Sequence, residues 1–169
     1  EIEPRDVAIV VADGLSAVAI DQNCIPLLQS LIGKLRDKTL SLCPIVVAAQ
    51  GRVALGDEIG EILQARLVLV LIGERPGLTS IDSIGAYLTF APKSGIHDAS
   101  RNCVSNIRPA GMTFDVATDK LCWLMTEALR RRETGVGLKD VQHLGTESHV
   151  GAIEASGPIL GGEHQPELE

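Results

Sequence analysis

Three apolar segments rich in β-branched residues constrain the fold of this chain more than any other feature. They read VAIVVA at Val7–Ala12, LCPIVVA at Leu42–Ala48 and LVLVLI at Leu67–Ile72. A strand that is apolar on both faces is typical of a parallel sheet covered on both sides. Helix-like patterns separate the three segments, and this alternation predicts right-handed crossovers. We therefore predict an α/β fold: a single Rossmann-like, three-layer domain with a mainly parallel sheet and helices on both faces.

Three helices are predicted from the spacing of apolar residues. The first covers Leu15–Leu35 in two pieces, with Asn23 as the N-cap of the second piece. The second covers Asp57–Gln64 and carries acidic residues in its first turn, where the helix dipole favours them. The third covers Phe114–Arg132, and Gly135 is its expected stop signal.

Two further strands and one change in amino-acid composition complete the predicted organisation. The strands are AYLTF at Ala86–Phe90 and a shorter extended piece at Cys103–Ile107. Residues 1–140 are expected to form the α/β domain. Residues 141–169 are rich in Gly, His, Glu, Pro and Ser, so we expect a C-terminal tail without a core of its own.

The bulk composition excludes several classes of protein. Apolar residues make up 45% and charged residues 22% of the 169 positions, as in soluble globular proteins. The net charge is −7 and only four residues are aromatic, which excludes a nucleic-acid partner. No apolar run approaches the roughly 18 residues of a membrane helix, and no signal peptide is visible, so we expect a cytoplasmic protein without membrane contact. The four cysteines are too widely spaced for a zinc site or a disulfide framework.

Three loops are expected to share the edge of the sheet at which ligands of open α/β folds bind. They are Asp13–Leu15, Gln50–Val53 and Gly73–Gly77, and each follows a predicted strand. In the third loop, GERPG, Glu74 can accept hydrogen bonds and Arg75 can bind an anion. A tight turn with a solvated Glu–Arg pair explains the same residues. Asp13 is either a ligand contact or the cap of the following helix.

A complete catalytic set cannot be assembled from the sequence. The phosphate-binding loop, the dinucleotide fingerprint and the hydrolase nucleophile elbow are all absent. Cys103 lies in the polar segment HDASRNCVSNIRP, but nothing in the spacing places His97 beside it as a base. We therefore predict no catalytic residue and no metal ligand in this chain.

Five strings together resemble one family, the small subunit of ethanolamine ammonia-lyase. The match runs almost without a gap from Asp6 to Asp140. The strings are VAIVVADGLSA, GRVALGDEIGEIL, GERPGLTSIDSIGAYLTFAP, RNCVSNIRP and TGVGLKD. No single string is specific, but the set is. The family's subunit normally has a longer N-terminal region, which is expected to be missing here.

The resemblance implies a lyase subunit that contacts a cofactor. The family's enzyme converts ethanolamine to acetaldehyde and ammonia by the radical chemistry of adenosylcobalamin, the vitamin B12 coenzyme. A large subunit holds the catalytic site, and the small subunit closes over the cofactor in a hetero-oligomer. The family's cobalamin-contacting positions fall on Val53, Glu74 and Cys103. Asn102, Ser105 and Asn106 are further candidate hydrogen-bonding residues. The implied location is the cytoplasm, including the interior of a bacterial microcompartment.

Two other functions stay open at this point. One is a stand-alone small-molecule or nucleotide-binding α/β module, with Asp13 and Arg75 as its polar anchors. The other is a purely structural partner that contributes surface but no ligand contact.

Overall fold

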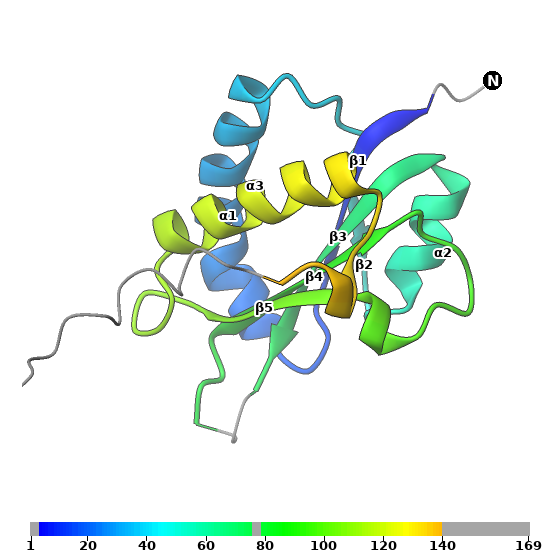
Figure 1. Cartoon of the computed structure of the whole chain (residues 1–169). Helices are drawn as coiled ribbons and strands as arrows, with labels where there is room; N and C mark the ends of the chain where they lie inside the picture. Colours follow the sequence, from blue (N-terminus) through cyan, green and yellow to red (C-terminus); the bar gives the residue numbers. More distant parts are fainter. Residues whose placement is uncertain (1–3, 76–78, 140–169) are drawn as a thin grey trace, which may run out of the picture. The chain divides into compact units, whose positions relative to one another are not determined.

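The computed structural model describes residues 4–75 and 79–139 (Figure 1). The elements are β1 (Arg5–Ala12), α1 (Ala17–Asp37), β2 (Val46–Ala48), α2 (Leu55–Ile62), β3 (Ala65–Glu74), β4 (Ser83–Phe90), β5 (Asn102–Ile107) and α3 (Phe114–Arg131), with short 3₁₀ turns at Asp98–Ser100 and Gly135–Gly137. The predicted tail at 141–169, and Pro76 and Gly77 of the third loop, lie outside the described residues.

The sheet is mixed, so the prediction of a mainly parallel sheet is not confirmed. Its strand order is β2-β1-β3-β4-β5. The pairs β1–β2 and β1–β3 are parallel, as the apolar segments predict, whereas β3–β4 and β4–β5 are antiparallel. Only residues 75–82 connect β3 to β4, and a parallel return would need a crossover of about a dozen residues or more.

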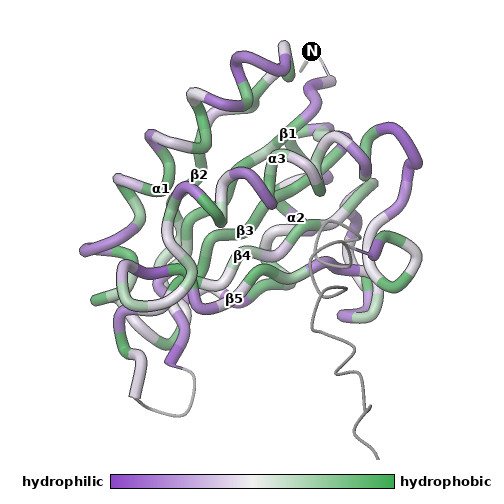
Figure 2. The backbone as a smooth tube through the Cα atoms, turned by 60° about the vertical axis from the view of Figure 1, so that its left-hand side comes forward, coloured by the Kyte–Doolittle hydropathy of each residue, from purple (hydrophilic) through white to green (hydrophobic). Residues whose placement is uncertain are grey.

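Side chains of β1 and β3 alternate between two apolar clusters, one on each face of the sheet. Odd-numbered residues such as Ile9 and Leu69 pack with α1 and α3. Even-numbered residues such as Val10 and Val68 pack with Ile59 and the rest of the α2 region. Figure 1 shows α1 and α3 on one side of the sheet and α2 on the other, and Figure 2 shows hydrophobic residues concentrated along the strands. Each large apolar side chain that becomes fully buried contributes about 1.5–3 kcal/mol to this core.

The predicted helix caps are wrong in two places. Helix α1 is continuous, and its N-cap is Ser16, whose Oγ accepts a hydrogen bond from the Ala19 N–H. Asn23 lies inside this helix and donates instead to the carbonyl of Asp82. Helix α3 ends at Arg132 in the left-handed conformation, with φ of 61°, before Gly135 is reached. No helix in the described ranges is long and apolar enough to cross a membrane.

Candidate functional site

The three predicted loops begin at one edge of the sheet. Ala12, the last residue of β1, is in register with Ala48 of β2 and with Ile72 of β3, so the carboxyl ends of these parallel strands coincide. The backbone N–H of Leu15 donates to the carbonyl of Gly73 at 2.9 Å, which joins the first loop to the third. The strand order in the sequence therefore predicted the position of this edge correctly.

Asp13 joins the first loop to the second and does not cap helix α1. The backbone N–H of Gln50 is the main reason why the pKa of the Asp13 carboxyl lies below its ordinary value, and the N–H groups of Gly14 and Gly51 act in the same direction. One of its oxygens, Oδ1, is buried without a hydrogen-bond partner among the described residues. Asp13 is therefore a charged group held by the loop backbones.

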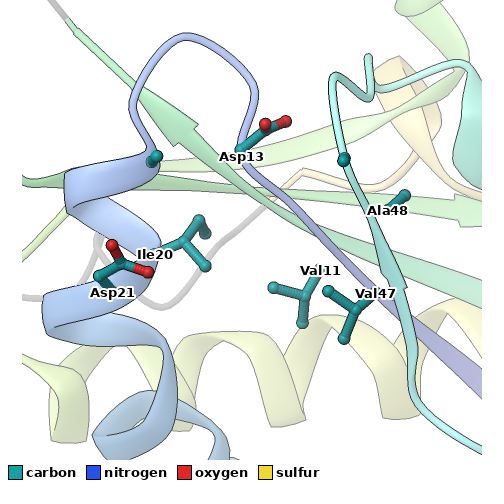
Figure 3. A pocket seen from close by; sticks show the side chains of 8 residues that line it. Val11, Asp13, Ile20, Asp21, Val47 and Ala48 are labelled. Carbon is teal, nitrogen blue, oxygen red and sulfur yellow. The ribbon is translucent and has the colours of Figure 1, made fainter.

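A pocket of about 200 Å³ opens beside Asp13, between the ends of β1 and β2 and the start of α1 (Figure 3). Apolar side chains such as Val11 and Val47 form its wall, and Asp21 contributes a second carboxylate. Arg75 lines a different pocket, with Leu15 and Ile81. The structure thus places the two anchors of the alternative small-molecule module in separate pockets.

Glu74 and Cys103, both predicted site residues, lie on either side of one tyrosine. Glu74 is the last residue of β3, and its Oε1 accepts a hydrogen bond from the Tyr87 hydroxyl at 2.5 Å. Tyr87 lies on β4 directly opposite Cys103 of β5. We call Glu74, Tyr87 and Cys103 the polar cluster. Glu74 and Tyr87 are half-buried, and Cys103 is exposed.

The polar cluster extends from the end of β3 across β4 to β5, beyond the strands on which α2 packs. Helix α2 packs on β1 and β3, whereas Cys103 and Ser105 on β5 remain exposed. A ligand or another chain can cover an exposed sheet face that carries polar side chains. Sequence reasoning missed Tyr87, because only the strand register brings it to Glu74 and Cys103.

Tyr87 and Cys103 of the polar cluster keep their protons at neutral pH. Burial raises the pKa of Tyr87, and the hydrogen bond to Glu74 raises it further. Although Cys103 is exposed as a residue, desolvation of its sulfur raises the pKa of the thiol; the Tyr87 hydroxyl acts in the opposite direction, and the negative charge of Glu74 raises the pKa further. Because the thiolate is the nucleophilic form, these shifts disfavour a nucleophilic role for Cys103.

Val53 lies at the turn that leads into α2. It packs against the apolar cluster of the α2 side, which Tyr87 also contacts. Its carbonyl accepts a hydrogen bond from the Gly56 N–H at 3.0 Å, whereas its own N–H has no partner in the part of the chain that the structure describes. Of the two backbone groups of Val53, the N–H is therefore the one without a partner in the described ranges.

A buried ion pair connects α2 to the start of β5. The Arg101 guanidinium binds both carboxylate oxygens of Asp57, at 2.5 and 2.7 Å, and also donates to Thr89 and to the carbonyl of Ile96. Arg101 precedes the polar cluster residue Cys103 by two positions. Nothing in the sequence spacing signals this pairing across 44 positions.

Asn102 is structural, contrary to its suggested part in ligand binding. Its side-chain amide donates to the carbonyl of Leu138 at 2.7 Å and accepts from the Gly135 N–H at 2.8 Å. These bonds use both ends of the amide inside the chain. The remaining cysteines, Cys24, Cys43 and Cys122, are buried as free thiols.

The charge state of Tyr87 can be measured directly, because it is the only tyrosine in the chain. We expect the tyrosinate absorbance near 295 nm to stay low when the pH rises past 10, the ordinary tyrosine pKa. Since the folded-state pKa is raised, Tyr87 contributes stability that is complete below pH 10 and is lost at higher pH. In Glu74→Gln, tyrosinate should form at lower pH than in the wild type. Identical titrations of the two proteins would contradict the hydrogen bond.

The described residues form an α/β domain whose mixed sheet carries the polar cluster. The chain belongs to the ethanolamine ammonia-lyase light chain family, whose sequence model matches residues 1–139. This confirms the resemblance seen in the sequence. Groups of three or more His, Cys, Asp or Glu side chains that could hold a metal ion are not found within the described ranges.

Curated relatives support the same family. The chain is 53% identical over 153 residues to the ethanolamine ammonia-lyase small subunit of Azotobacter vinelandii, which covers 90% of this chain and 54% of that protein. It is 50% identical over 156 residues to the small subunit of Xanthomonas campestris pv. campestris, covering 92% of this chain and 53% of the relative. The chain thus spans about half the length of these relatives.

Proposed function

We propose that this chain forms one wall of the adenosylcobalamin site of an ethanolamine ammonia-lyase and contacts the cofactor where it meets the large subunit. The observation that carries this proposal is the polar cluster, which extends from the end of β3 across β4 to β5. The reaction of the whole enzyme is the conversion of ethanolamine to acetaldehyde and ammonia. The cofactor supplies the radical chemistry, and this chain binds and orients it.

The groups of the site fit the edge of a corrin ring, which carries amide side chains. The Glu74 carboxylate can accept a hydrogen bond from an amide or from a ribose hydroxyl. The Val53 N–H can donate to an amide oxygen. Cys103 presents a neutral thiol, which contacts the ligand without adding charge. None of these residues is proposed as a catalytic acid, base or nucleophile.

The Rossmann-like part of the chain, in this proposal, is limited to β1, β2, β3 and their helices. Ligands of such folds bind at the carboxyl edge, where Val53 and Glu74 lie. The antiparallel strands β4 and β5 extend the ligand-facing surface to Cys103. We further propose that the chain works in a hetero-oligomer. Its proposed location is the cytoplasm, which includes the interior of a bacterial microcompartment.

The test is to co-express the full chain with a large subunit and to measure cobalamin affinity and acetaldehyde formation. We expect Glu74→Ala to weaken cobalamin binding about tenfold, because a charge-assisted hydrogen bond is lost. Asp37→Ala is the control, since it removes an exposed carboxylate at the end of α1, which covers the opposite face. Unchanged affinity in Glu74→Ala would show that Glu74 is structural and would count against this function.

The pocket beside Asp13 favours one alternative, a stand-alone small-molecule or nucleotide-binding module. Calorimetry of the isolated chain with ATP or AMP decides between the two functions. Tight binding that Asp13→Asn abolishes would support the alternative. Absence of a binding heat would exclude the stand-alone module for ATP and AMP. It is also the result that the proposed function predicts, because one wall of a shared site is not expected to bind tightly alone.

A further inference from the structure

The Glu74 side chain lies across β4 and not out into solvent. A Cβ atom added at Gly85 would lie 2.5 Å from Glu74 Oε1 and 2.6 Å from Oε2, so the carboxylate occupies the space that a side chain at this position would need. Gly85 and Tyr87 lie on the same face of β4, two residues apart. The glycine therefore provides the path along which Glu74 reaches Tyr87.

The Tyr87 hydroxyl uses only one of the two carboxylate oxygens. It donates to Oε1, whereas Oε2 accepts no hydrogen bond from the described residues. Burial and the neighbouring carboxylate raise the pKa of Tyr87, so the hydroxyl keeps its proton and remains a donor. Without this donor, a glutamate at the end of a strand would sample several rotamers.

We infer that Tyr87 is a positioning residue, which holds the Glu74 carboxylate flat on the sheet so that Oε2 faces the ligand as an acceptor. This inference rests on the proposed cobalamin contact of Glu74 and adds a residue that acts through it. The ligand group that meets Oε2 is a hydrogen-bond donor, an amide N–H or a hydroxyl. Tyr87 itself need not touch the ligand.

The experiment is a double-mutant cycle in the complex of the full chain with the large subunit, with cyanocobalamin as the titrated probe. Tyr87→Phe removes the hydroxyl and keeps the ring that packs on the apolar cluster. We expect Tyr87→Phe to weaken binding about fivefold, because the loss of one hydrogen bond frees Glu74. In the Glu74→Ala background, Tyr87→Phe should cause no further loss, since it has nothing left to position.

The outcomes separate this inference from the function on which it rests. If Glu74→Ala weakens binding and Tyr87→Phe does not, Tyr87 has no positioning role. Losses that add in the double variant would also overturn the inference, because Tyr87 would then act independently of Glu74. Unchanged binding in Glu74→Ala would instead remove the proposed function. Urea unfolding of each variant shows whether the chain is folded under the binding conditions.

Discussion

Replacing Arg101 by methionine is expected to lower the free energy of unfolding by about 3–5 kcal/mol. The substitution would leave Asp57 as a buried carboxylate without its partner. The two side chains are 3% and 2% exposed, so water cannot replace the lost bonds without opening the structure. Urea unfolding followed by the fluorescence of the single tryptophan, Trp123, measures the change.

Two control variants separate the buried charge from the loss of an ion pair in general. Asp119→Asn removes the exposed partner of Lys34, and such surface pairs contribute about 0–1 kcal/mol. The double variant Asp57→Leu with Arg101→Met removes both charges and should recover much of the lost stability. A loss below about 1 kcal/mol for Arg101→Met alone would contradict the buried pair.

The same ion pair has a consequence for the candidate site. It fixes helix α2, which follows Val53, to the segment that leads into Cys103. These two residues are 50 positions apart in the numbering, and their separation depends on how α2 lies against β5. We therefore expect variants at Asp57 or Arg101 to lose cobalamin affinity together with stability.

Sequence patterns were sufficient to predict the helices and strands, but they were insufficient to predict how the strands pair. The apolar runs of β1 and β3 are buried on both faces, and this property is local and visible in the residues themselves. The direction of β4 is not local. It depends on the short connection at 75–82, which leaves too few residues for a parallel crossover, and the prediction of a mainly parallel sheet took no account of this length.

In the candidate site, too, local features followed from the sequence and features that depend on strand pairing did not. The position of Glu74 at a strand end followed from the sequence, because parallel strands end at one edge. The Glu74–Tyr87 bond did not, because it requires the register of β3 on β4, including the glycine at 85. Asp57 lies in the first turn of α2 as predicted, but its ion pair with the distant Arg101 could not be predicted from the spacing.

Replacing Gly73 by alanine is the second change with a large expected effect, a loss of about 3 kcal/mol of stability. A Cβ atom at this position would lie 2.6 Å from the carbonyl oxygen of Asp13 and closer still to that of Ser16. Both are backbone atoms, which cannot rotate away as a flexible side chain could. The first loop would have to move, and with it Ser16, the N-cap of α1.

The matched control is Gly33→Ala, since Gly33 is an exposed interior residue of α1, where an added Cβ would meet nothing within 4 Å beyond the neighbouring backbone of its own helix. There alanine should stabilise the chain by about 0.5–1 kcal/mol, because glycine is the poorer helix former. Urea unfolding of both variants measures the opposite signs. If Gly73→Ala is as stable as the wild type, the first loop does not pack on β3, and the shared loop edge on which Glu74 depends is lost. If Gly73→Ala and Gly33→Ala lower the free energy of unfolding equally, the loss comes from replacing a flexible glycine and not from the contact of the new Cβ atom with the first loop.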